Sequence, residues 1–354
     1  MAMSDEEWVT HDKLQNLRKS IANLDSRTVV LVGDVMLDRY VHGYANNLDP
    51  TAAVPVLKET HREQGAGAAA HVARGLKSFG LRSKLFAIVG DDDAGSELLE
   101  LLENEEVETG GIAIVEGRRT TVKTRLIAAR ESLIDQKQLM LRWDSEESEE
   151  PQKSIAESLI NQACSAIKDA SALVISDYGK GVLSDEGAKK LIQTANECGI
   201  PVISDPKLTG LHRINGANVA IMKARGLELM RRRSGTENSH DAAKQILVEN
   251  NIHSLLVAGG ESGTTLYRDG EPPVHVNCQI ENPTQQVGLL DAANVAMTAA
   301  LASGFAAEDG CILANTACEV ILAGEATSLE TVLSARALAT RLDEVAWSMQ
   351  TSQR

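Results

Sequence analysis

Short apolar segments rich in valine, isoleucine and leucine alternate with longer segments of helical periodicity along most of the chain. The strand-like segments include "TVVLVGD" (28–34), "SKLFAIVGDD" (83–92), "ALVISD" (172–177), "PVISD" (201–205) and "SLLVAGG" (254–260). Strands that are apolar on both faces are typical of parallel sheets covered by helices on each side. The alternation therefore predicts an α/β fold with a mostly parallel central sheet.

Two stretches interrupt this alternation. Residues 40–63 and 118–143 have an extended, partly polar pattern, and we expect them to form hairpins of a small sheet that projects from the main one. Residues 1–27 are expected to form a helical lead-in. Residues 28–345 are then a single domain that contains both hairpins, and residues 346–354 a C-terminal tail.

Composition excludes some classes of function. The 354 residues carry a formal net charge of −15, which argues against a nucleic-acid partner because phosphate backbones are bound by excess lysine and arginine. No apolar stretch predicts a membrane span. The five cysteines lack the paired spacing of metal sites and indicate reduced thiols. We therefore expect a cytoplasmic protein without nucleic-acid or membrane partners.

Acidic residues and glycines stand at the carboxyl ends of the expected strands. Asp34, Asp91, Asp177 and Asp205 each end a strand-like segment, and Gly259-Gly260 ends another. In open α/β sheets, ligands bind beyond the carboxyl ends of the strands. The pattern predicts several carboxylates around one crevice, and the alternative role of each is to cap the helix that follows.

Three segments carry a family resemblance. "VVLVGDVMLDRY" (29–40), "VISDYGKGVLS" (174–184) and "VISDPK" (202–207), in this order, resemble segments of the PfkB, or ribokinase-like, carbohydrate kinases. The resemblance extends from about 28 to 325 and is closest to heptose-7-phosphate kinases, of which we expect the kinase domain only. It implies a three-layer α/β sandwich with a small β-sheet lid. It further implies ATP and Mg2+ as cofactors, a sugar or sugar phosphate as substrate, and a homodimer formed through the lid.

In this family an aspartate at the end of a "GAGD" segment acts as base, and backbone N–H groups of that segment hold the transferring phosphate. The corresponding segment is "QVGLLD" (286–291), with Gly288, Leu289 and Leu290 in the anion hole and Asp291 as the base. A leucine in left-handed geometry costs roughly 1–2 kcal/mol, and its side chain obstructs the approach of a phosphate. The segment thus predicts a compromised anion hole. Asp291 also fits a second interpretation, as N-cap of the apolar helix that follows.

The resemblance assigns further residues to the sugar and the nucleotide. Asp34 and Asp38 are expected to bind sugar hydroxyls, and Gly67 and His71 to lie at the start of a helix beside the sugar. The remaining positions are Lys123, Arg125 and Arg142 in the lid, Asp177, Lys180, Asp205 and Lys207 in the crevice, and Gly260, Glu261 and Gly263 in a turn near the nucleotide. The lid cations have surface ion pairs as their alternative role.

The metal site is not assigned. The family's Asn-x-x-Glu segment, which helps to organise magnesium, corresponds to a stretch with Lys223 and Gly226 at those positions and Glu228 nearby. Together with the leucines, this departure leaves an active sugar kinase and an inactive pseudokinase that binds a sugar phosphate or a protein both open. A third hypothesis, dinucleotide binding, rests on "GAGAAA" (65–70) before a helix.

Overall fold

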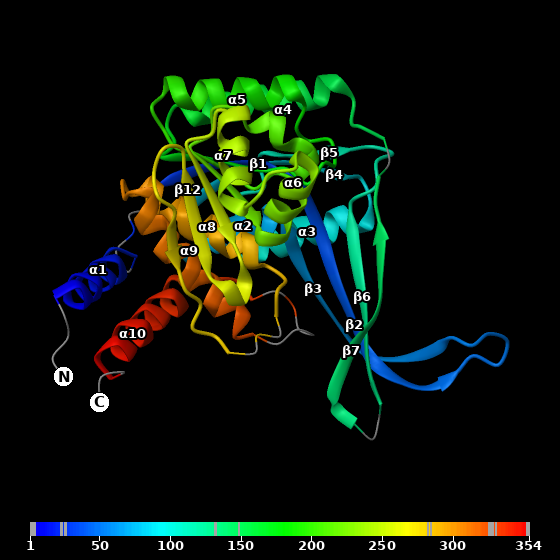
Figure 1. Ribbon diagram of the computed structural model, residues 1–354. Coiled ribbons are helices and arrows are strands. Elements are labelled where there is room, and N and C mark those ends of the chain that lie inside the picture. Colours follow the sequence, from blue (N-terminus) through cyan, green and yellow to red (C-terminus); the bar gives the residue numbers. More distant parts are fainter. Residues whose placement is uncertain are drawn as a thin grey trace.

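The centre of the molecule is a sheet with the strand order β13-β12-β11-β10-β9-β8-β1-β4-β5 (Figure 1). The computed structural model describes residues 5–21, 24, 27–130, 133–147, 149–281, 283, 285–324, 329 and 331–351. The strands are β1 (Thr28–Gly33), β4 (Arg82–Gly90), β5 (Ile112–Val115), β8 (Ala172–Ser176), β9 (Val202–Ser204), β10 (Val219–Lys223), β11 (Ser254–Ala258), β12 (Thr264–Arg268) and β13 (Val274–Val276). From β5 to β11 each strand pairs with its neighbours in parallel, and β12 and β13 add antiparallel. The mostly parallel sheet is confirmed.

Helices cover both faces of this sheet, as Figure 1 shows. Alternate side chains of β1 go to opposite cores, Val29 and Leu31 to one and Val30 and Val32 to the other, because successive residues of a strand point to opposite faces. The first core is closed by α1 (Asp5–Ile21), α2 (Ala69–Ser78), α3 (Asp93–Asn104), α8 (Leu289–Ala302), α9 (Ala307–Leu322) and α10 (Ala335–Thr351). The second is closed by α4 (Lys153–Ile167), α5 (Asp185–Glu197), α6 (Ala224–Ser234) and α7 (Ser239–Glu249). The three-layer sandwich is thereby confirmed.

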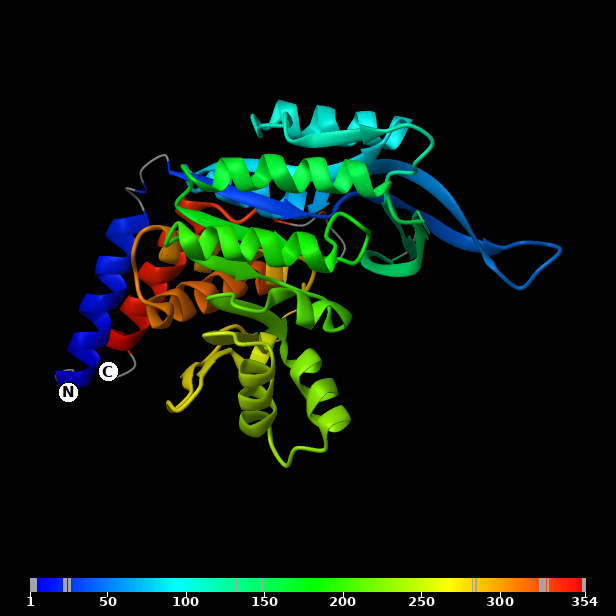
Figure 2. The same cartoon turned by 90° about the horizontal axis from the view of Figure 1, so that it is seen from above.

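A second, smaller sheet projects from this body (Figures 1 and 2). It has the order β3-β2-β6-β7, formed by β2 (Val35–Leu48), β3 (Pro55–Ala68), β6 (Val122–Arg130) and β7 (Leu133–Ser145). The two hairpins β2–β3 and β6–β7 are antiparallel, and β2 pairs with β6 in parallel. Residues 40–63 fall within the first hairpin, and the stretch 118–143 begins four residues before the second. We call the small sheet the lid.

Residues 65–70, the basis of the dinucleotide hypothesis, span the junction of β3 and α2. The strand that precedes the helix pairs antiparallel with β2. A dinucleotide fingerprint requires a parallel βαβ unit around its glycines. The structure therefore gives that hypothesis no support.

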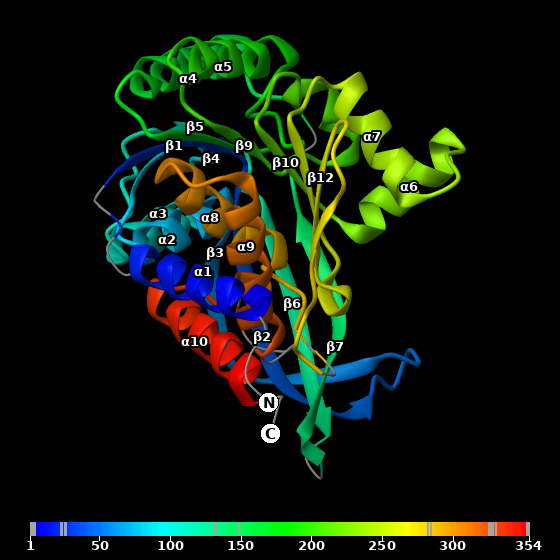
Figure 3. The same cartoon turned by 60° about the vertical axis from the view of Figure 1, so that its left-hand side comes forward.

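The ends of the chain are helical within the described residues. α1 occupies residues 5–21 of the expected lead-in, and α10 continues through Thr351, so the segment expected as a tail is helix up to that residue. The two helices lie side by side in Figures 2 and 3, and Arg18 donates to Asp343 at 2.7 Å. β5, β12 and β13, three to five residues long, are not predicted by the sequence pattern.

The direction of chain progression reverses between two neighbouring strands. From β1 the sheet grows through β4 and β5 on one side, and from β8 it grows through β9, β10 and β11 on the other. Such a switch point opens a crevice at the carboxyl ends of the strands. Asp34 follows β1 and Asp177 follows β8, so both aspartates lie at this point.

Candidate active site

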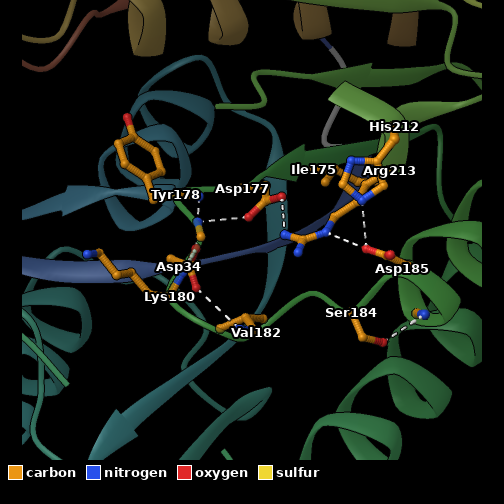
Figure 4. A network of polar contacts seen from close by, with 12 residues as sticks. Asp34, Ile175, Asp177, Tyr178, Lys180, Val182, Ser184, Asp185, His212 and Arg213 are labelled. Carbon is orange, nitrogen blue, oxygen red and sulfur yellow. Dashed lines mark hydrogen bonds and ion pairs between the residues drawn. The ribbon is translucent and has the colours of Figure 1, made fainter. Parts of the chain in front are cut away.

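Asp34 holds the loop that follows β8. Its buried carboxylate accepts hydrogen bonds from the backbone N–H groups of Tyr178 at 2.8 Å, Lys180 at 3.0 Å and Val182 at 3.4 Å (Figure 4). Burial raises the pKa of Asp34, and the three N–H groups act in the opposite direction. The carboxylate that the sequence analysis assigned to sugar hydroxyls therefore has backbone partners of its own and shapes the crevice wall.

Asp177 lies in the same loop and also has protein partners. It accepts hydrogen bonds from the N–H of Gly179 and from Nη1 of Arg213, both at 2.9 Å, and Arg213 also donates to Asp185 at 2.8 Å (Figure 4). Arg213 belongs to the 3-10 helix η1 (Leu208–Ile214). Because Arg213 bridges the loop to the start of α5, this ion-pair network fixes the loop from its other side.

Asp38 and Gly67 meet at the base of the lid. The buried Asp38 forms an ion pair with Arg125, whose guanidinium carbon lies 4.9 Å from the centre of the Tyr40 ring. A Cβ atom at residue 67 would overlap Oδ2 of Asp38, so the position accepts only glycine without a shift. The structure thus brings Asp38 and Gly67 together. Arg125 balances the charge of Asp38.

The residue after Gly67 is strained. Ala68 precedes α2 with φ 55° and ψ −130°, and its neighbour Ala69 donates to the backbone oxygen of Asp34 at 3.0 Å. This backbone conformation favours glycine, because a Cβ crowds the adjacent peptide groups. His71, one turn into α2, is buried; burial lowers its pKa, while the charges of Asp291 and Asp38 act to raise it. His71 therefore lies within electrostatic reach of both aspartates.

Asp291 lies in the first turn of α8, not at its N-cap. The N-cap is Gly288, which has φ 83° and makes no side-chain capping hydrogen bond, and Ala292 donates to its carbonyl at 2.9 Å. Asp291 is buried, and the Tyr178 hydroxyl donates to its Oδ1 at 3.4 Å. The interpretation of Asp291 as a helix cap is therefore wrong, and its carboxylate faces the loop after β8.

Leu289 and Leu290 are the first two residues of α8, with helical backbone geometry. The non-glycine residues with positive φ within the described chain are Ala68, Glu106 and Asn251, and neither leucine is among them. Leu289 is buried in the first core and Leu290 packs against it. The expected left-handed strain is therefore wrong, because only Gly288 takes that conformation. The N–H groups of the first helical turn have no partner four residues earlier, as at any helix start.

Lys207 lies within electrostatic reach of Asp291 and of two further lysines, Lys123 and Lys223. Nζ of Lys207 lies 3.8 Å from the centre of the Tyr178 ring, and Nζ of Lys123 lies 5.8 Å from it. Burial lowers the pKa of Lys207, Asp291 acts to raise it, and the charges of Lys123 and Lys223 act to lower it further. The crevice thus holds positive charge next to a helix N-terminus, an arrangement that suits an anion.

Asp205 completes the group of carboxyls. It accepts hydrogen bonds from the Ser176 hydroxyl at 3.2 Å and from Nδ2 of Asn294 at 3.3 Å. Burial raises the pKa of Asp205 well above its ordinary value, and the neighbouring charge of Asp291 raises it further. Like charges disfavour double ionisation, so the charge of Asp291 adds to the effect of burial on Asp205.

Arg142 and Lys180 are engaged by acidic neighbours. Arg142 pairs with Asp144 at 2.9 Å on β7, and its side chain is 52% exposed. Arg142 thus takes part in a surface ion pair, the second role considered for the lid cations. Nζ of Lys180 pairs with Glu146. Neither cation is directed at Asp291 by these contacts.

The glycine turn expected near the nucleotide forms the 3-10 helix η2 (Gly260–Ser262), directly after β11. Gly260 and Gly263 have φ of 62° and 78°, and the Gly259 N–H donates to the Gly263 carbonyl at 2.7 Å. A Cβ atom at Gly263 would overlap the carbonyl of Val276. Because the turn follows β11, it lies three strands from β8 along the same sheet.

The segment expected to organise magnesium offers no carboxylate to the crevice. Glu228 accepts hydrogen bonds from Arg231 at 2.7 and 2.9 Å and from Arg232 at 2.7 Å, which lowers its pKa to about 2. Lys223 ends β10, where a ligand would be needed, and a cation repels Mg2+. The residues of this segment therefore do not fit a magnesium site.

Sequence reasoning missed Tyr178, Ser176, Arg213 and Asn294 as residues of this site. Tyr178 and Ser176 lie inside the quoted segment 174–184, so their signal was present in the motif itself. Asn294 lies three residues after Asp291 and therefore on the same face of α8. Arg213 comes from a connecting segment without periodicity, and only the folded chain shows its partner.

The chain was compared with known proteins. Residues 26–331 match the family described as pfkB family carbohydrate kinase. The bifunctional protein HldE of Haemophilus influenzae is 32% identical over 308 residues, which cover 87% of this chain and 62% of that protein. HldE of Pectobacterium atrosepticum is 34% identical over 307 residues, 86% of this chain and 61% of that protein. The chain thus matches about three fifths of the length of these relatives.

Solved structures show the same fold. The phosphofructokinase-2 of Escherichia coli in complex with substrates and products superposes with a TM-score of 0.71 at 20% identity, over 90% of this chain and 99% of that one. The ribokinase of Arabidopsis thaliana complexed with ribose and ATP gives a TM-score of 0.65 at 16% identity, over 90% and 99%. Among the described residues, no helix has the length and apolar character needed to cross a bilayer.

Proposed function

The chain belongs to the pfkB family of carbohydrate kinases, and we propose that it transfers the γ-phosphoryl group of ATP to a hydroxyl of a phosphorylated sugar of the heptose 7-phosphate class. The observation that carries this proposal is the convergence of Asp291, Tyr178 and Lys207. They come from α8, from the loop after β8 and from the segment after β9, and the tyrosine contacts both other side chains.

In this proposal Asp291 acts as the general base. A carboxylate at hydrogen-bonding distance from a sugar hydroxyl accepts its proton as the oxygen attacks phosphorus. The Tyr178 hydroxyl orients that carboxylate at 3.4 Å. ATP, when bound, supplies the transferred phosphoryl group. Phosphoryl transfer depends mainly on position and charge stabilisation, and the start of α8 together with Lys207 provides both.

A phosphorylated acceptor is favoured by the distribution of cations. Arg125, Arg142 and Lys180 are paired with carboxylates, whereas the ion pairs of the described residues include neither Lys123 nor Lys207. Both ammonium groups flank the same Tyr178 ring. A sugar phosphate seated between the lid and this ring would meet both ammonium groups directly, whereas a neutral sugar would offer them no anionic partner.

The first experiment is calorimetric titration of ATP into the protein with and without Mg2+. It requires no knowledge of the sugar. Release of ADP is then measured with heptose 7-phosphate, fructose 6-phosphate and ribose as acceptors. Asp291→Asn is expected to lower turnover by at least about 10²-fold, the usual contribution of a positioned acid or base. The matched control is Asp12→Asn, a carboxylate on α1 that is 75% exposed. Undiminished turnover in the Asp291 variant would refute the role of the base.

The second candidate is an inactive pseudokinase that binds a sugar phosphate or a protein partner. Two observations favour it. Glu228 is held by two arginines of its own helix, and Lys223 stands at the end of β10. The titration separates the candidates. ATP binding and ADP release that both need Mg2+ support the kinase, and binding of a sugar phosphate without any ATP binding supports the pseudokinase.

A homodimer through the lid is part of the same proposal. Leu139, Leu141 and Trp143 on β7 have exposed fractions of 55%, 56% and 65%, and β7 is an edge strand of the lid. Apolar side chains gathered on an edge strand favour pairing with another chain. Light scattering is expected to give twice the mass of one chain, and Leu141→Lys is expected to give the monomer.

The thiols favour a reducing compartment for this activity. Each of the five cysteines is free, and burial raises the pKa of Cys311 and of Cys318 to about 12. Thiols without disulfide partners are typical of the cytoplasm. We therefore assign the activity to the cytoplasm, where fractionation with an epitope-tagged chain would locate it.

A further inference from the structure

The lid carries a cluster that the kinase chemistry does not use. His42 of β2 and His61 of β3 are direct partners across the hairpin, and Glu63 lies two residues further on the same strand face. One ligand atom of each side chain lies within 4.8 Å of the others. Cross-strand neighbours and residues two apart share one face of a sheet. The register of β2 and β3 therefore places two imidazoles and a carboxylate together.

The Nε2 atoms of both rings lie near the carboxylate of Glu63. Nε2 of His42 lies 3.7 Å from Oε2 of Glu63, and Nε2 of His61 lies 3.9 Å from Oε1 of the same carboxylate. Both distances exceed a hydrogen bond. The Thr60 hydroxyl contacts Nδ1 of His61 at 3.2 Å, which leaves Nε2 of that ring toward Glu63. Two Nε2 atoms and a carboxylate thus surround one position.

His42 gives an independent reason to expect a ligand. Its side chain is 5% exposed, and within the described chain neither ring nitrogen has a hydrogen-bond partner. A buried polar group without a partner costs free energy. Burial and the neighbouring His61 lower the pKa of His42, whereas the carboxylate of Glu63 acts to raise it.

We propose that His42, His61 and Glu63 bind a divalent transition-metal ion, with zinc as the best match, and that the ion clamps β2 to β3 in the lid. Zinc accepts imidazole nitrogen and carboxylate oxygen at about 2.0–2.2 Å in tetrahedral geometry, with water as a fourth ligand in open sites. Such bond lengths place neighbouring ligand atoms about 3.4 Å apart. Each N–O separation must therefore shorten by only a few tenths of an ångström.

Three features shape this site. The rings stack in parallel with centroids 4.4 Å apart and an interplanar angle of 1°, so they must rotate to direct both lone pairs at one ion. His61 and Glu63 are 53% and 38% exposed, which provides the path of entry. The charge of Lys137 lies within electrostatic reach of His42 and opposes a bound cation. Its removal is expected to strengthen binding.

The test is titration of zinc chloride alone into the tag-free full chain, with competition by a chromophoric chelator. All proteins carry Cys198→Ser, which removes an exposed thiol. One zinc per chain is expected. His61→Ala and Glu63→Gln are expected to weaken affinity by at least roughly tenfold, since even outer partners of a metal ligand contribute about that much. Lys137→Gln should tighten binding severalfold.

The matched control is His212→Ala, an exposed histidine beside a carboxylate, with Nε2 at 2.9 Å from Asp185. It should bind zinc as the parent does. Hydrogen exchange gives a second readout, in which zinc slows exchange of residues 38–44 and 58–64 in the parent and not in His61→Ala. Equal affinity in the parent and His61→Ala, or no binding at micromolar zinc, would overturn the proposal. These readouts do not depend on kinase activity.

Discussion

The start of α8 can be tested with two substitutions of Leu290. Alanine and glycine remove almost the same side chain, which packs partly buried against the first core. The shared loss is about 1–2 kcal/mol of unfolding free energy, roughly half that of a fully buried leucine. The variants differ in the backbone term. Leu290 is helical, and glycine is less stable than alanine in a helix by about 0.5–1 kcal/mol.

The opposite sign is expected if Leu290 adopts the left-handed conformation. Glycine would then be the more stable variant, by roughly 1–2 kcal/mol. Urea denaturation, followed by circular dichroism, measures the difference between the two variants directly. The helical backbone predicts that Leu290→Ala unfolds at the higher urea concentration. A glycine variant as stable as the alanine variant, or more stable, would refute the helical geometry and restore the argument that this anion hole is strained.

Three further predictions concern the crevice and the base of the lid. Ala68→Gly is expected to raise the free energy of unfolding by about 1 kcal/mol, because φ 55° favours glycine; a lower melting temperature in a thermal scan would contradict this. Gly67→Ala should raise the KM for the sugar and lower stability, since the new Cβ overlaps Asp38; unchanged kinetics and unfolding would show that the lid adapts freely. The pKa of Asp205 is raised by burial and by Asp291, so the folded state binds its proton more tightly than the unfolded state. Stability attributable to Asp205 is therefore lost as the pH rises from about 4 through the raised pKa, and Asp205→Asn should flatten that loss in urea titrations across pH.

The resemblance and the strand–helix alternation were sufficient to predict the architecture. The parallel sheet, the helices on both faces and the projecting lid follow from local patterns, because an apolar run of five residues or an amphipathic run of twelve fixes its own secondary structure. The resemblance likewise singled out Asp291, directly after "VGLL" at the start of an apolar helix, and its role as base stays a prediction.

The partner of each polar side chain was not predictable in this way. Asp34 was expected to bind sugar, yet its carboxylate holds N–H groups that are 144 to 148 residues away in sequence. The strain expected at two leucines lies instead at Ala68, because the helix begins one residue after Gly288 and the leucine side chains enter the core. Local pattern gives no information on such choices.

The sequence by itself determined the fold class and family of this protein, since periodicity and motif are properties of neighbouring residues. Only the tertiary structure decided which charges meet. It brought Lys207 and Tyr178 to Asp291 from separate segments, and it paired two lid histidines through the register of β2 and β3. The physical reason is that hydrogen bonds and ion pairs act over a few ångströms in space, and the fold alone sets which residues come that close.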